Sequence, residues 1–135
     1  MRGVEIPSQG PDEGAGAPPV LCVVDGDAAV RAALGMTLRS IGFEVRTYES
    51  GAAFMLSGVA HACQVLIADI HQPGMGGLEL PGALREAGIR LPIVFMAAAW
   101  PAPVREAALA AGAVAVLDKP VAADALLQAV RAALG

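Results

Sequence analysis

The sequence predicts an α/β fold: a doubly wound, five-stranded parallel sheet covered by helices on both faces. Three observations predict it. Short, nearly continuous apolar runs recur along the chain, as in strands that are buried on both faces. A segment with the spacing of an amphipathic helix follows each run, so the order is strand then helix, repeated five times. Polar residues follow three of the runs, where open α/β sheets present their functional groups.

The composition fits one globular domain. The chain has 135 residues, of which 56% are hydrophobic and 16% are charged, enough for one real core. Its net charge is −4 without a basic cluster, which argues against direct nucleic-acid binding by this domain. No apolar run approaches the roughly 20 residues of a membrane span, and no secretory signal is visible. We therefore expect a cytoplasmic protein without membrane contact.

The ordered domain is predicted over residues 20–135. Residues 1–19 are rich in Gly and Pro, nearly lack large apolar residues, and are expected to form a flexible tail. Residues 20–24 (VLCVV) form the first predicted strand. Asp27 then caps a helix that ends at Gly42. The predicted apolar face of this helix consists of Val30, Leu34, Leu38 and Ile41.

The central strand follows a second, weaker strand and a short helix. Residues 43–48 alternate apolar and polar side chains, as an edge strand does. Ser50 caps a short helix that ends near Gly58. Residues 64–69 form a buried strand that delivers one acid, Asp69, into a Gly- and Pro-rich loop.

The second half of the chain repeats the pattern. A third helix is expected over residues 78–87, with an irregular first turn because Pro81 and Gly82 are poor residues for a helix interior. Residues 92–97 form the fourth strand, and the loop after it holds the only tryptophan, Trp100.

The last two helices flank the fifth strand. Pro103 fits the first turn of a helix that ends at Gly112. Residues 114–117 form the fifth strand, and Lys119 follows it. The final helix spans residues 123–134. Its apolar face consists of Leu126, Leu127, Val130 and Leu134.

Acids and one amine are predicted to meet at the carboxyl ends of the strands. Asp25 and Asp27 follow the first strand, Asp69 the third and Lys119 the fifth. Carboxylates bind hard divalent cations such as Mg²⁺, and a carboxylate can attack phosphorus to form an aspartyl phosphate. The lysine can pair with a phosphoryl oxygen. Two simpler interpretations stay open: Asp27 only caps its helix, and Lys119 forms a salt bridge to Asp69 or Asp25.

Four blocks resemble the response-regulator receiver domain of two-component signalling. They are VVDGDAAVR at 23–31, LIADIHQPGMGG at 66–77, PIVFMAAA at 92–99 and GAVAVLDKP at 112–120. The resemblance covers residues 20–135 and implies the strand order 2-1-3-4-5 of a flavodoxin-like sheet.

The resemblance also implies roles for individual residues. Asp69 would be the phosphoacceptor, and Lys119 the cation that pairs with the phosphoryl group. Asp25, Asp69 and the backbone carbonyl of His71 would hold Mg²⁺. The peptide bond between Lys119 and Pro120 would be cis. The domain would accept a phosphoryl group from a histidine kinase or phosphotransfer protein and act as a signalling domain, not as an enzyme.

Three positions depart from the family pattern. The second acid expected after the first strand is Gly26, so the metal site loses a negative ligand and Mg²⁺ should bind weakly. The hydroxyl residue expected at the end of the fourth strand is Ala97, and the aromatic residue expected in the fifth strand is Val116. We therefore expect an atypical receiver whose phosphorylation changes its conformation only weakly.

Other functions remain open at this stage. The first is a phosphorylation-independent pseudo-receiver that binds proteins through its last two helices, which are also a candidate homodimer surface. A remote alternative is a phosphatase of the haloacid-dehalogenase type, because the D-x-D of Asp25 and Asp27 resembles its first motif. A flavodoxin-like cofactor binder would need a Gly-rich phosphate-binding loop after the first strand, which the sequence lacks. The sequence shows no effector motif, so output is expected through a partner protein or a further domain.

Overall fold

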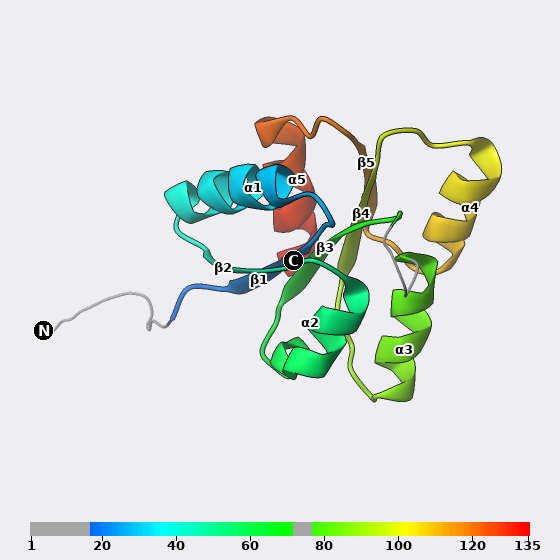
Figure 1. The fold of residues 1–135 in the computed structure, drawn as a ribbon, viewed down its shortest axis with the longest axis horizontal. Helices are drawn as coiled ribbons and strands as arrows, with labels where there is room; N and C mark the ends of the chain where they lie inside the picture. Colours follow the sequence, from blue (N-terminus) through cyan, green and yellow to red (C-terminus); the bar gives the residue numbers. More distant parts are fainter. Residues whose placement is uncertain (1–16, 72–76) are drawn as a thin grey trace, which may run out of the picture.

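The computed structural model describes residues 17–71 and 77–135, and these form a five-stranded parallel sheet with helices on both faces (Figure 1). The strand order is β2-β1-β3-β4-β5, as predicted. Most of the predicted tail, 1–19, and residues 72–76 lie outside the described residues. Among the described residues, no helix is both long and apolar enough to cross a membrane.

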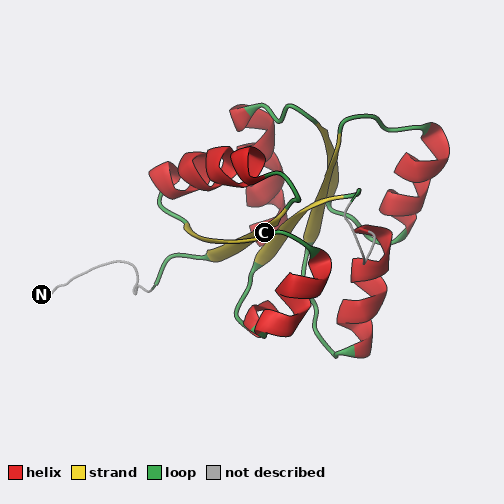
Figure 2. Ribbon diagram, in the orientation of Figure 1, coloured by secondary structure: helices red, strands yellow, loops and turns green. Residues whose placement is uncertain are grey.

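Strands and helices alternate along the chain, which confirms the predicted fold class (Figure 2). Two short 3-10 turns are also present: Val59–His61 lies before the third strand, and Gly77–Glu79 lies before the third helix. The elements are β1 (Val20–Val24), α1 (Ala28–Ile41), β2 (Glu44–Tyr48), α2 (Gly51–Ser57), β3 (Val65–Asp69), α3 (Leu80–Glu86), β4 (Ile93–Ala97), α4 (Ala102–Ala110), β5 (Ala115–Asp118) and α5 (Ala123–Leu134).

The sheet separates two apolar cores. Successive residues of a strand point to opposite faces, so Leu66 and Phe95 pack beneath α2, α3 and α4. Ile67 and Val94, one position away in the same strands, pack beneath α1 and α5. Figure 1 shows this division of the helices between the two faces. Burial on both faces explains why β1, β3 and β4 are nearly continuous apolar runs.

The helix ends form as the sequence predicts. The Asp27 carboxylate accepts a hydrogen bond from the Ala29 N–H at 2.8 Å, and the Ser50 hydroxyl accepts one from the Ala53 N–H at 3.0 Å. Gly42 ends α1 in the left-handed conformation, with φ of 117°, which a residue with a Cβ adopts at a cost. Together these caps fix where α1 and α2 begin and where α1 ends.

Three details refine the predicted elements. Ile41 does not belong to the buried face of α1: it is 41% exposed, because it is the last helical residue and Phe43 packs against that core instead. The fifth strand includes Asp118, which pairs in register with Ala97 of β4. The third helix has the expected irregular start, since the 3-10 turn precedes α3.

Candidate functional site

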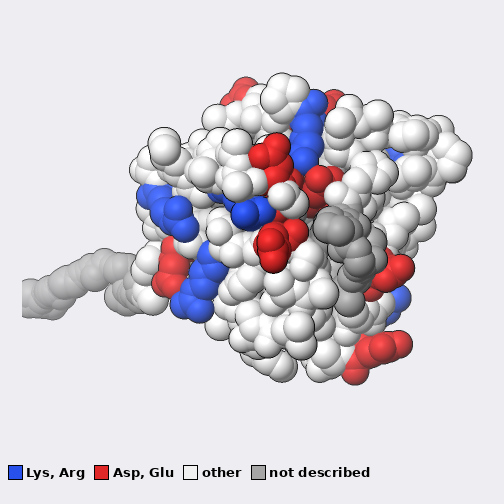
Figure 3. All heavy atoms as spheres, viewed as in Figure 1, with Lys and Arg blue, Asp and Glu red and all other residues white. Residues whose placement is uncertain are grey.

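Asp25, Asp69 and Lys119 meet at the carboxyl ends of the strands, although they lie far apart in the sequence. The Lys119 ammonium is 2.6 Å from Asp25 Oδ2 and 2.8 Å from Asp69 Oδ2. Asp25 follows β1, Asp69 ends β3 and Lys119 follows β5, so three parallel strands bring the groups together. In Figure 3, acidic and basic side chains lie interleaved near the centre of the face in view.

Asp25 is almost completely buried, with 1% of its surface exposed. Its Oδ1 accepts the Asp27 N–H at 2.8 Å, while Oδ2 pairs with the lysine. Its backbone is held as well: its N–H donates to the Tyr48 carbonyl at 3.1 Å, and its carbonyl accepts from Arg31 Nη1 at 2.6 Å. A charge buried this deeply requires such partners, because desolvation of an unpaired carboxylate is costly.

Asp69 is the last residue of the central strand and is 8% exposed. Its Oδ1 accepts the His71 N–H at 3.0 Å, and its Oδ2 pairs with Lys119. Its position in the middle of the sheet, between β1 and β4, leaves little freedom for its backbone. The carboxylate is therefore held in place at the sheet edge, which suits a nucleophile that must be aimed at a phosphorus atom.

Lys119 links the two acids. Burial lowers the pKa of its ammonium group, but hydrogen bonds and charge interactions with Asp25 and Asp69 outweigh this effect and raise the pKa above the ordinary lysine value. The backbone N–H of Lys119 donates to the Ala97 carbonyl at 2.9 Å. The Lys119–Pro120 peptide bond is cis, as the family resemblance implied. The salt-bridge interpretation of Lys119 thus holds for both acids.

Asp27 and the two histidines lie outside this cluster. The Asp27 carboxylate caps α1, which supports the structural interpretation of this residue over a role as acid or base in a phosphatase. His61 and His71 have exposed side chains. The role of the His71 carbonyl as a metal ligand stays a prediction.

The oxygen donors fit a hard cation such as Mg²⁺ in kind. Two carboxylates converge, and Gly26 stands where the family has a further acid. Among the described residues, no three His, Cys, Asp or Glu side chains gather as a metal-binding group. Asp25 and Asp69 also have Lys119 between them, so the ion would compete with an ammonium group. The site therefore offers Mg²⁺ two carboxylate ligands, and the Lys119 ammonium competes with the ion for both of them.

Sequence reasoning missed three features around the site. Trp100 donates its indole N–H to the Leu117 carbonyl at 2.9 Å, and Arg31 donates to Asp25. A Cβ at Gly77 would lie 2.6 Å from Ile70 Cα, so the chain passes directly against the residue after Asp69. These contacts join segments distant in sequence or depend on loop shape. In the sequence, the adjacent glycines at 76 and 77 were the only indication that the backbone passes close to another segment here.

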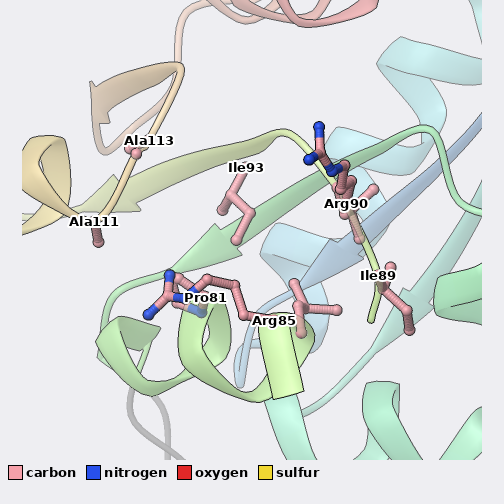
Figure 4. Close-up of a pocket in the computed structure, with 10 residues that line it drawn as sticks. Pro81, Arg85, Ile89, Arg90, Ile93, Ala111 and Ala113 are labelled. Atoms are coloured by element: carbon pink, nitrogen blue, oxygen red, sulfur yellow. The ribbon is translucent and has the colours of Figure 1, made fainter. Parts of the chain in front are cut away.

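A separate pocket of about 370 Å³ lies at the opposite end of the sheet (Figure 4). Ile93, the first residue of β4, lines it together with Pro81, Ile89 and the exposed residues Arg85 and Arg90. None of the described residues that line it carries a carboxylate, and its position at the amino end of β4 separates it from Asp69 at the carboxyl end of β3. It is not part of the acid–lysine site.

The strand order and the acid–lysine site together define a receiver-like signalling domain. The chain belongs to the family: the model of the response regulator receiver domain matches residues 21–131. TodT of Pseudomonas putida, a response regulator protein, is 38% identical over 115 residues, which are 85% of this chain and 51% of TodT. TdiR of Thauera aromatica, a transcriptional regulatory protein, is 41% identical over 114 residues, covering 83% of this chain and 49% of TdiR.

Solved structures show the same fold. The response regulator StyR aligns with a TM-score of 0.80 and 38% identity, over 87% of this chain and 60% of the StyR chain. Chemotaxis protein CheY4 of Vibrio cholerae aligns with a TM-score of 0.78 and 26% identity, over 85% and 98% of the two chains. This chain spans about half the length of the curated relatives it matches.

Proposed function

We propose that this receiver domain accepts a phosphoryl group on Asp69 from a histidine kinase or phosphotransfer protein and relays the signal through protein contacts. The observation that supports it most directly is the Lys119 ammonium held between Asp25 and Asp69. An anionic nucleophile and an anionic phosphoryl group repel each other, and the ammonium offsets this repulsion. The domain acts as one partner in a transfer reaction and not as an enzyme with its own substrate.

The transfer uses the carboxylate of Asp69 as the nucleophile. A bond forms between a carboxylate oxygen and phosphorus, the phosphorus–nitrogen bond of the phosphohistidine breaks, and the imidazole of the donor leaves. Lys119 pairs with a phosphoryl oxygen in place of Asp69 Oδ2. Asp25, Asp69 and the His71 carbonyl would hold Mg²⁺, which when bound offsets further negative charge. With Gly26 in place of an acid, we expect this binding to be weak.

Phosphorylation is expected to change the conformation only weakly. Ala97 ends β4 without a hydroxyl that could donate to a phosphoryl oxygen, and a hydrogen bond to a charged group contributes about 1.5–3 kcal/mol. Val116 in β5 has no aromatic ring that could move inward. Two contributions that favour a phosphorylated conformation are thus missing.

Mass spectrometry after incubation with acetyl phosphate and Mg²⁺ tests the phosphoacceptor. The wild-type chain should gain the mass of one phosphoryl group, and Asp69→Asn should gain none. Asp27→Asn is the matched control, because Asn also caps a helix and Asp27 lies outside the acid–lysine cluster. An unmodified wild-type chain, or modification that persists in Asp69→Asn, would contradict the proposal.

The pseudo-receiver is the second candidate, and the surface of α4 favours it. Only Ala108 of this helix is buried, whereas Leu109 is 46% exposed. Val114, which lies in the segment between α4 and β5, is 40% exposed. A partner protein or a second copy of the chain could cover these two apolar side chains. If signalling and self-association survive in Asp69→Asn but are lost in Leu109→Glu, the interaction module is the correct interpretation.

The proposal also covers where the signal goes and in which cellular compartment the domain works. TdiR is a transcriptional regulatory protein, and this chain covers half of it. We infer that the signal passes to an effector domain or downstream partner, and that nucleic acid is not bound by the receiver itself. Cys22 and Cys63 are free and buried, in keeping with a reducing compartment, so we place the domain in the cytoplasm.

A further inference from the structure

Trp100 connects the loop between β4 and α4 to the fifth strand. Its Nε1–H donates to the Leu117 carbonyl at 2.9 Å, a contact across 17 positions of sequence. The indole is half-buried and packs against the core beneath α2, α3 and α4. The ring is therefore anchored at both its polar and its apolar part, as buried tryptophans usually are.

The anchored carbonyl lies two residues before Lys119. The Lys119 N–H itself donates to the Ala97 carbonyl at 2.9 Å, at the start of the same loop. Two hydrogen bonds from the β4–α4 region thus hold the end of β5 on both sides of Asp118. β5 needs this support because it is the edge strand of the described sheet, next to β4, and its residues are partly exposed.

The position of Trp100 also bears on the missing aromatic of β5. Val116 and Trp100 both pack against the core beneath α2, α3 and α4. Val116 is small, and the indole supplies an aromatic ring to this side of β5 from the neighbouring loop. Unlike a ring carried by β5, it is attached to the segment that leads directly into α4, which begins at Ala102.

We propose that Trp100 is a positioning residue of the acid–lysine site. Its indole N–H holds the Leu117 carbonyl, this fixes the end of β5, and the Lys119 ammonium is thereby placed between Asp25 and Asp69. The same bond ties the β4–α4 loop to the position of Lys119. The positioning role of Trp100 rests on the contacts described above. A response of the loop to phosphorylation rests in addition on the proposed function.

The chain offers a direct test because it has a single lysine and a single tryptophan. In protein labelled with ¹³C,¹⁵N-lysine, the side-chain signal comes from Lys119 alone. Trp100→Phe keeps a ring but removes the N–H donor, and should shift this signal at neutral pH. Ser57→Ala is the matched control: it removes side-chain hydrogen bonds to the Phe54 carbonyl and the Val59 N–H in and after α2.

A lysine signal that moves no more in Trp100→Phe than in Ser57→Ala would overturn the positioning role. Loss of fold stability alone does not shift the signal of the folded molecules, so this readout separates positioning from mere packing. The same hydrogen bond gives a second measurement: Lys119→Met should change the fluorescence emission of Trp100, because the end of β5 to which the indole is bonded loses its lysine contacts. Unchanged emission would also count against the role.

Phosphorylation is then measured separately. Acetyl phosphate with Mg²⁺ should change Trp100 emission in the wild type and leave it unchanged in Asp69→Asn. If mass spectrometry shows phosphate on Asp69 while the emission is constant, the link to the loop is wrong. If no phosphate is found, the proposed function fails, and the lysine signal of Trp100→Phe still decides the positioning role.

Discussion

At the scale of single residues, the Lys119 ammonium explains how Asp25 and Asp69 can both be buried close to each other. Asp25 is 1% exposed, and its carboxylate lies near that of Asp69 through their common partner Lys119. Removing one member of a buried ionic cluster leaves the others unpaired, which is more damaging than the net strength of the cluster suggests. Lys119 therefore supports the fold as well as the proposed chemistry.

Lys119→Met should lower the free energy of unfolding at neutral pH by about 1–3 kcal/mol, because Asp25 Oδ2 and Asp69 Oδ2 each lose their ammonium partner. The raised pKa of Lys119 fixes the pH dependence. Its contribution is fully present below the ordinary lysine pKa of 10.5 and disappears as the pH rises through the higher folded value. From neutral pH upward, urea unfolding of both proteins should show a constant difference in the free energy of unfolding, and this difference should close in alkali. A gap that closes near neutral pH would contradict this.

Gly77 is predicted to be irreplaceable, because an added Cβ would meet Ile70 Cα at 2.6 Å and the Asp69 carbonyl at 3.0 Å. Gly77→Ala should destabilise the fold by about 1–3 kcal/mol, as overpacking does, and should reduce phosphorylation of Asp69. The control is Gly82→Ala in α3, where the nearest atom is a flexible arginine nitrogen at 3.8 Å. That change should stabilise by about 0.5–1 kcal/mol. Similar thermal midpoints for the two variants would contradict the prediction.

At the scale of elements, the N-terminus of α1 separates two interpretations of Asp27. Its carboxylate caps the helix by accepting the Ala29 N–H. Asp27→Ala should therefore lower stability by about 1 kcal/mol, while Asp27→Asn should be nearly neutral, because Asn is as good a cap. Neither change should abolish phosphorylation of Asp69. Chemical denaturation and mass spectrometry check both parts, and loss of phosphorylation in Asp27→Asn would give the residue a chemical role.

The sequence made the elements themselves predictable, because local rules determine them. Apolar runs marked the buried strands, and Asp27, Ser50 and Gly42 marked helix ends through caps that involve near neighbours. The extent of β5 was less accessible, since pairing of Asp118 with Ala97 determines it. The Trp100–Leu117 hydrogen bond could not be predicted, because it depends on how a loop folds over a strand.

At the scale of the whole molecule, the acid–lysine site exists only when the sheet is complete. Asp25 follows β1, Asp69 ends β3 and Lys119 follows β5, and β4 must be in place between β3 and β5. The strand order thus converts three distant positions into neighbours. That the three groups would meet was predictable from the order of elements; that one ammonium would contact both acids required the structure.

The last prediction concerns how far a signal spreads from this site. With Gly26, Ala97 and Val116 in place of an acid, a hydroxyl residue and an aromatic residue, binding of Mg²⁺ and beryllofluoride should shift amide NMR signals near Asp69 and Lys119 but only slightly along α4. Small shifts in α4 are expected because few contacts favour a second conformation, and a ligand moves an equilibrium only by its differential affinity for the two states.

Trp100 sharpens this expectation. Its hydrogen bond to β5 holds the β4–α4 loop in the arrangement seen here, so Trp100→Phe should enlarge the α4 shifts if that bond is what restrains the loop. Ala97→Thr is the complementary change, because it adds a hydroxyl donor for the phosphoryl group and should also enlarge the α4 shifts. Large, concerted shifts through α4 in the wild-type chain would instead show that the domain switches fully without these three family residues.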